Sequence, residues 1–302
     1  MSSTSEMSDA QLRYLATHLR DEVLHKIFSS KITLFLCGKS KEAGKSIRSQ
    51  LAREFTNGIN SYRYEIIYPE DLFEELAFGR RRYDLLSLEN ILADSVDAIV
   101  LVPESAGALV ELGAFANNDR LRGRIICVQD EKHKKRRSFV QYGPLRLLRR
   151  EGRDRVIYVN GSSVTEDQMK RLRGAVSMVA RVSPKRADVT NIIQMQHFIL
   201  PALYLLEPIT KQALGRLLRY AADPPSNEAE TAGIAALSVL SKKRLVELSN
   251  DGYRLTRQGL AYFKRLARHG KSRTYLDLDA MDTLRVQILT LTCRQKAFSA
   301  TL

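Results

Sequence analysis

Five short apolar runs, separated by segments of helical pattern, constrain the fold of this chain more than any other feature. The runs are mostly apolar, as expected of strands that are covered on both faces. Strands that alternate with helices predict right-handed crossovers and an α/β fold with a doubly wound parallel sheet, whose ligands bind at the carboxyl ends of the strands. The runs span residues 32–37, 64–68, 98–102, 124–128 and 156–159.

The helical pattern becomes dominant after Ser183 and Pro184, which indicates a domain boundary. A chain of 302 residues also exceeds the size at which one hydrophobic core keeps growing. We therefore expect three parts. They are an amphipathic N-terminal helix within residues 1–30, the α/β domain over 31–183 and a second, mostly helical domain over 184–302.

The second domain has the element order of a winged helix-turn-helix. Helices are expected over 211–221 and 231–241, with Thr210 as the cap of the first. Asp251-Gly252 predicts a tight hairpin turn between two short strands, and Thr256 precedes a last helix. The stretch is similar to the wing of bacterial winged-helix domains. Such domains bind DNA or dock other proteins, and both alternatives remain open.

The charge distribution favours a polyanionic partner. The net charge is +14, and nucleic acid is the usual polyanion of a cell. Aromatic Phe139 and Tyr142 lie between two basic stretches that follow the fourth strand, 132–137 and 146–155. We expect the basic side chains to contact phosphates. The candidates are Lys132, Lys134, Lys135, Arg136 and Arg137 in the first domain, and Lys242, Lys243, Arg244 and Arg254 in the second.

Cysteine and histidine usage points to a cytoplasmic protein without a metal. The three cysteines are far apart in the sequence, which fits reduced thiols rather than disulfides. The five histidines are scattered without metal-ligand spacing, so no metal or cofactor is expected. No run of eighteen apolar residues and no apolar leader is present, which disfavours membrane insertion and secretion.

The clearest chemical signal follows the third strand. Ser105 suits a helix N-cap, and Gly107 lets a ligand approach the backbone closely. Glu111 then falls within the first two turns of a helix that begins at the carboxyl end of the strand. A carboxylate there faces the ligand crevice of an α/β protein. The alternative is a solvated helix residue without a chemical role.

This segment resembles the nucleoside 2-deoxyribosyltransferase family, whose nucleophilic Glu lies in a Glu-Leu-Gly triplet, here Glu111-Leu-Gly113. The resemblance implies cleavage of an N-glycosidic bond through an oxocarbenium-like state that the carboxylate traps or stabilises. It also implies substrate contacts for Gly107, for Ser105 in place of the usual Asp, and for Glu89 near the base. A neutral Ser105 does not repel phosphate, so a nucleotide or dinucleotide becomes acceptable.

The loop after the first strand, residues 38–46, superficially resembles a phosphate-binding P-loop. The loop is one residue too long, because Lys39 stands where the first required glycine should be. An NTPase is therefore disfavoured. Gly38 and Lys39 are expected to line the substrate crevice instead, with Lys39 attracting a substrate phosphate.

The Glu111 segment joined to a basic winged helix is similar to the effector (toxin) proteins of bacterial retrons. That resemblance implies an antiphage effector that a reverse transcriptase and multicopy single-stranded DNA keep inactive. The resemblance to the transferases, whose sites are often completed by a neighbouring subunit, implies a homo-oligomer or higher assembly. The expected activity is that of an N-glycosidase on a nucleotide-type substrate such as NAD. Two alternatives remain: a transferase that moves deoxyribose between bases, and a non-enzymatic, nucleotide-sensing DNA-binding regulator.

Overall fold

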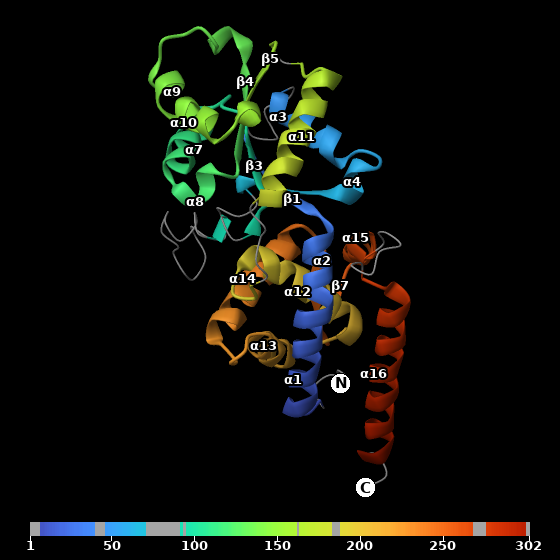
Figure 1. The fold of residues 1–302 in the computed structure, drawn as a ribbon. Helices are drawn as coiled ribbons and strands as arrows, with labels where there is room; N and C mark the ends of the chain where they lie inside the picture. Colours follow the sequence, from blue (N-terminus) through green and yellow to red (C-terminus); the bar gives the residue numbers. More distant parts are fainter. Residues whose placement is uncertain are drawn as a thin grey trace. The chain divides into compact units, whose positions relative to one another are not determined.

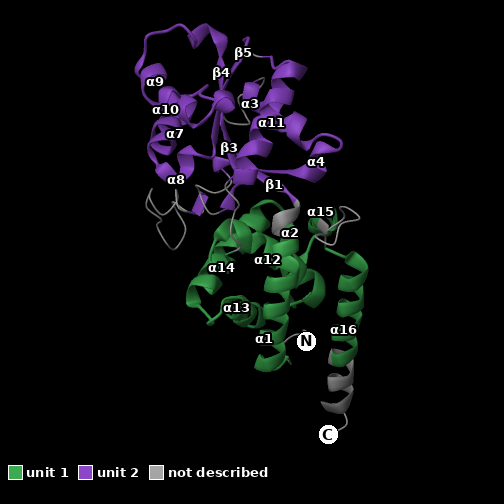
Figure 2. Ribbon diagram, in the orientation of Figure 1, with its two compact units in different colours: residues 1–30, 187–302 green, residues 31–186 purple. Residues whose placement is uncertain are grey.

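The computed structural model describes residues 7–39, 46–70, 91–92, 95–161, 163–182, 188–267 and 276–299. The chain divides into two compact units, which Figure 2 colours separately. One unit comprises Lys31–Arg186, and we call it the α/β unit. In the other, Met1–Ser30 joins Ala187–Leu302, and we call it the helical unit.

A parallel sheet of five strands forms the centre of the α/β unit, in the order β2-β1-β3-β4-β5. All four neighbouring pairs run parallel. The order reverses between β1 and β3, which makes the carboxyl ends of these two strands the topological switch point. The α/β class expected from the sequence is confirmed. The strands are β1 (Ile32–Cys37), β2 (Tyr64–Ile67), β3 (Ala98–Leu101), β4 (Ile125–Asp130) and β5 (Val156–Val159).

Helices cover both faces of this sheet (Figure 1). On one face, α3 (Ile47–Thr56) and α11 (Glu166–Val182) pack on side chains such as Leu34. On the other, α7 (Ala106–Asn117) contributes Phe115, whose ring lies 6.4 Å from that of Phe35. Neighbouring strand residues therefore pack against opposite faces of the sheet, which explains why apolar residues follow one another along β1.

Short helices complete the α/β unit. The basic stretch that begins at Arg146 lies largely in α10 (Pro144–Glu151). Leu145 and Leu148 form the buried face of α10, whereas the arginines of this helix are exposed. This is the pattern of an amphipathic helix. The others are α4 (Asn60–Arg63), α8 (Asp119–Arg122), η4 (Glu131–His133), α9 (Phe139–Tyr142) and η5 (Arg153–Arg155).

The helical unit is built around α12 (Ile192–Leu206), which is buried along almost its whole length. The N-terminal segment, consisting of α1 (Asp9–His18), a π-helical turn (Leu19–Leu24) and α2 (His25–Ser30), belongs to this same unit. The remaining helices are α13 (Lys211–Tyr220), α14 (Asn227–Lys242), α15 (Arg257–Ala267) and α16 (Leu278–Ser299).

A two-stranded antiparallel hairpin lies between α14 and α15, formed by β6 (Val246–Ser249) and β7 (Gly252–Leu255). Ser249 pairs with Gly252, so the two turn residues are Asn250 and Asp251. The turn thus lies one residue earlier than the Asp251-Gly252 turn expected from the sequence. Gly252 still has a positive φ of 131°, and a Cβ there would lie 2.2 Å from a backbone oxygen.

Gly259 provides a test of packing between α15 and the hairpin. A Cβ at this position would lie 1.9 Å from the carbonyl oxygen of Leu245, so Gly259→Ala should destabilise the protein by about 1–3 kcal/mol or more. Thermal unfolding followed by circular dichroism measures the effect. The control is Gly174→Ala in the middle of α11, where a Cβ meets nothing within 4 Å and the change should stabilise by about 0.5–1 kcal/mol. Equal midpoints for the two variants would contradict this packing.

Candidate functional site

Glu111 lies in the second turn of α7, close to the carboxyl ends of β1 and β3. The helix begins directly after the loop that follows β3, and its N-cap is Ser105, whose hydroxyl accepts a hydrogen bond from the amide of Ala108 at 3.2 Å. The cap expected from the sequence is confirmed. The Glu111 side chain is half-buried, and its carboxylate accepts a hydrogen bond from the thiol of Cys37, the last residue of β1. The carboxylate therefore stands at the switch point of the sheet.

The surroundings of Glu111 hold its pKa above the ordinary carboxyl value. Burial is the main cause, and the charge of Glu70 acts in the same direction. The Cys37 hydrogen bond and the positive charge of Arg48 partly oppose this rise in pKa. Burial, together with the neighbouring Glu111 carboxylate, raises the pKa of the Cys37 thiol well above its ordinary value. The thiol therefore stays protonated and acts as a hydrogen-bond donor.

Arg48 on α3 holds the loop after β1. Its side chain is only 3% exposed. The guanidinium donates to the carbonyl oxygens of Gly38 and Lys39 and makes two bonds to the carboxylate of Glu70, at 2.7 and 2.9 Å. It also lies 4.9 Å from the ring centre of Tyr68. Within the described residues its Nε is buried and has no hydrogen-bond acceptor.

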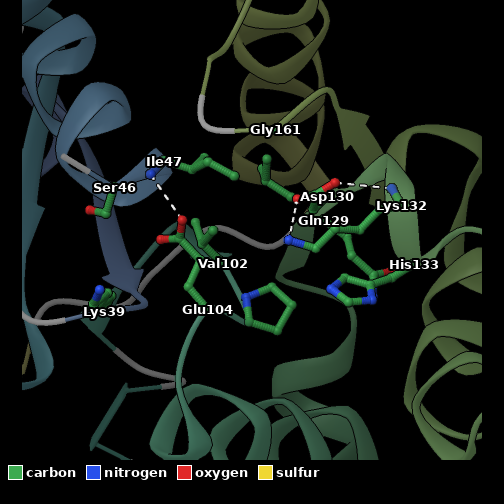
Figure 3. A pocket seen from close by; sticks show the side chains of 12 residues that line it. Lys39, Ser46, Ile47, Val102, Glu104, Gln129, Asp130, Lys132, His133 and Gly161 are labelled. Atoms are coloured by element: carbon green, nitrogen blue, oxygen red, sulfur yellow. Dashed lines mark hydrogen bonds and ion pairs between the residues drawn. The ribbon is translucent and has the colours of Figure 1, made fainter.

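A cavity of about 370 Å³ opens at the ends of β3, β4 and β5, next to the start of α3 (Figure 3). Glu104 points to the first turn of α3 and accepts a hydrogen bond from the amide of Ile47 at 3.0 Å. Asp130 pairs with Lys132 at 2.8 Å, and Lys39 and His133 also line the wall. A carboxylate thus occupies the place at the helix start where a P-loop would hold phosphate. The cavity volume falls within the usual range for small-molecule sites.

Of the predicted substrate-binding residues, some lie at the cavity and others do not. Gly38 and Lys39 lie at the end of β1 with Glu111 close by, and Lys39 reaches the cavity. The Ser105 hydroxyl accepts the cap hydrogen bond, and Gly107 is exposed in the first turn of α7. Neither is among the described residues that line the cavity, and the same holds for Glu111. Glu89 lies outside the described residues.

Sequence reasoning missed several polar residues at this edge. For Cys37 the sequence predicted only a reduced thiol, although its place at the end of the first apolar run puts it at the edge of the sheet. Glu104 follows β3 closely, and Asp130 ends a strand that extends two residues beyond its predicted end. Arg48 and Glu70 carry no signal in the sequence, because their pairing depends on how α3 packs against the segment after β2.

The predicted phosphate-binding residues of the α/β unit lie on and after η4. Lys132 pairs with Asp130, and Lys134 pairs with Glu131 at 3.4 Å. The ammonium of Lys134 also lies 5.2 Å from the ring centre of Tyr158. The side chains of Lys135, Arg136 and Arg137 are exposed. The segment is therefore a cationic surface.

The predicted cations of the helical unit lie around the start of the hairpin. Lys242 ends α14, Lys243 and Arg244 follow it, and Arg254 on β7 pairs with Asp251 at 3.0 Å. The other end of α14 is acidic, since Glu228 and Glu230 lie in its first turn. Positive charge is therefore concentrated at the carboxyl end of α14.

The comparison with known proteins now identifies the group to which the chain belongs. The family model described as "STM3845 retron effector protein" matches residues 44–248. This chain is a member of the retron effector family. It is 34% identical to the Escherichia coli protein named "Retron Ec86 putative ribosyltransferase/DNA-binding protein", over 97% of this chain and 95% of the relative. The Escherichia coli protein with the corresponding name from retron Ec73 is 29% identical over 38% of this chain and 37% of the relative.

Membership of the retron effectors confirms the resemblance that the Glu111 segment and the basic second domain suggested. Within the described ranges, no helix is both long and apolar enough to span a bilayer. Among the side chains that the structure describes, no group of three or more His, Cys, Asp or Glu residues is arranged to hold a metal ion.

The raised pKa of Glu111 predicts a pH-dependent effect on stability. Folding favours the protonated form of this carboxyl, so its contribution to stability is greatest below the ordinary pKa and is lost as the pH rises through the folded-state pKa. Glu111→Gln, which carries no charge, should therefore raise the unfolding temperature at about pH 7 and give a smaller gain at about pH 4. The control is Glu54→Gln, which removes the same charge from an exposed position. A constant difference across the pH range would contradict the interpretation.

Proposed function

We propose that this retron effector is an N-glycosidase that cleaves a nucleotide-type substrate such as NAD. The single observation that carries the proposal is the half-buried Glu111 carboxylate at the switch point between β1 and β3. A carboxylate in this position can stabilise or trap the ribosyl cation that forms as the glycosidic bond breaks. The names of both relatives include ribosyltransferase activity, which supports glycosyl-transfer chemistry.

Three residues that the sequence did not single out give Glu111 a defined environment. The Cys37 thiol donates to the carboxylate and restrains its orientation. Arg48 supplies positive charge nearby, which favours the ionised carboxylate that a nucleophile requires. Glu70 holds the guanidinium of Arg48 through two hydrogen bonds. We assign these residues positioning roles, since they act through Glu111.

The substrate would lie between Glu111 and the neighbouring strand ends. Gly38 and Lys39 would line the opening loop, with Lys39 near a substrate phosphate. Ser105 accepts the cap hydrogen bond and keeps its own O–H to donate to a sugar hydroxyl. Gly107 would allow close approach of the sugar, and Glu89 would position the base.

The basic surfaces would bind the retron nucleic acid. We propose that reverse transcriptase and multicopy single-stranded DNA hold the effector inactive, and that the chain acts as a homo-oligomer or within a higher assembly. The DNA-binding names of the relatives and the cations after η4 support the contact with DNA. The helix, helix and hairpin of the helical unit would act as a winged helix. Glu228 and Glu230 in the first turn of α14 would repel DNA, so this turn is not expected to read bases. We expect the basic carboxyl end of α14 to contact phosphates instead.

Glu111→Gln tests the enzymatic proposal. The purified chain is incubated with a panel of nucleosides, nucleotides and NAD, and released base is measured by chromatography. The variant should lose at least about 100-fold in rate, because the amide cannot trap or neutralise the cation. Glu54→Gln should keep the wild-type rate. Equal rates for Glu111→Gln and wild type would exclude the proposal and leave a nucleotide-sensing regulator.

The ribosyltransferase names of the relatives also favour a second candidate, transfer of the sugar to another base. Addition of a labelled free base to the same assay separates the two activities. Net hydrolysis leaves the label in the free base, whereas a transferase incorporates it into a nucleoside or nucleotide. The same assay with Glu111→Gln shows whether incorporation depends on the carboxylate.

A further inference from the structure

A second cavity of about 500 Å³ lies on the α/β unit, apart from the strand ends that hold Glu111. Its wall consists of five cations, two tyrosines and a glutamine, which come from the segment after η4, from α9 and α10, and from β5. None of these eight described residues is a carboxylate. Like charges gathered around a small volume repel one another, and a bound anion relieves that repulsion. The wall therefore favours an anionic ligand.

Gln141 organises this wall before any ligand binds. Its side chain is buried and donates to the side chain of Gln129 at 3.2 Å and to the carbonyl oxygen of His133 at 2.8 Å. Its own side-chain oxygen accepts a hydrogen bond from Arg149 at 2.7 Å, and Arg149 also donates to the hydroxyl of Tyr158. The guanidinium is thus held in place by neutral groups, which lowers the entropy lost when it binds an anion.

Two exposed aromatic rings accompany the cations. Tyr142, which lines the cavity, is 60% exposed, and Phe139, one turn earlier, is 88% exposed. Gly143 and the buried Pro144 follow immediately and begin α10. A Cβ at Gly143 would lie 2.8 Å from the carbonyl oxygen of Phe139, so glycine permits the tight connection between α9, which carries both rings, and α10. Exposed rings beside cations form the stacking platform typical of proteins that bind single strands.

We infer that this cavity binds one unpaired nucleotide of a single-stranded nucleic acid, with the base stacked on Tyr142 and the phosphate held by Arg146 and Arg149. The two arginines are three residues apart on α10 and share one face of that helix. A duplex keeps the faces of its bases stacked inside the helix, so only an unpaired base can use the ring. The inference rests on the nucleic-acid contact proposed above, and it specifies the strand form and the stacking residue.

The test measures binding by the full chain with fluorescence anisotropy. The probes are a labelled oligothymidine of about ten nucleotides and a duplex of the same length. Tyr142→Ala should weaken binding of the single strand about tenfold, since one base loses its stacking partner, and should leave duplex binding unchanged. Arg146→Ala should also weaken binding and should reduce the slope of log affinity against log salt by about 0.7, because one phosphate contact is lost. Arg150→Ala, an exposed arginine of the same helix outside the wall, is the matched control and should bind like wild type.

Three outcomes would overturn the inference. Unchanged single-strand affinity in Tyr142→Ala would leave a surface that contacts phosphates only. Equal losses in Arg146→Ala and Arg150→Ala would show that net charge, rather than the cavity, drives binding. If wild type binds neither probe, the proposed nucleic-acid contact fails as well, whereas base release in the Glu111→Gln assay is judged separately.

A photochemical measurement gives independent support without a variant. Oligothymidine that carries 5-iodouracil forms a covalent bond to an aromatic ring stacked on the modified base when it is irradiated. Mass spectrometry of the digested chain should place the adduct on Tyr142 or Phe139. Adducts confined to the helical unit would contradict the inference.

Discussion

A buried guanidinium, that of Arg48, holds together the edge of the sheet on which the candidate chemistry depends. A charge taken out of water must find partners, and Arg48 finds them in two loop carbonyls, a carboxylate and an aromatic ring. These contacts hold the chain after β1, and the charge of Arg48 partly opposes the rise in the pKa of Glu111 that burial causes. The hydrogen bonds that the buried Arg48 requires therefore hold the loop after β1 in place.

The sheet and its helices could largely be predicted from the sequence, because burial on both faces leaves a clear apolar signature. The N-cap role of Ser105 could also be predicted from the sequence, since a cap depends only on neighbouring residues. The reversal of strand order between β1 and β3 follows from the general behaviour of α/β folds rather than from any residue. Local signals therefore sufficed where the structure is set by short-range geometry.

Other elements left weak or misleading signals. Helix α12 is buried on nearly all sides, so its apolar residues show no clear helical periodicity, and it was not predicted. Helix α14 begins at Asn227, four residues before the predicted start, because its first turns are rich in alanine and carboxylates instead of large apolar residues. The pairing of Arg48 with Glu70 and of Cys37 with Glu111 arises only after distant segments pack together. Long-range polar contacts of this kind have no sequence pattern.

The short segment around η4 forms part of two different walls. Lys132 and His133 line the cavity at the strand ends, while Lys134, Lys135 and Arg136 line the cavity beside α9 and α10. Gln141 connects the two, because it bonds Gln129 and His133 on one side and Arg149 on the other. The two cavities therefore share one short stretch of backbone. A ligand that shifted this backbone at one cavity would change the affinity of the other cavity for its own ligand, and linkage would make the effect equal in both directions.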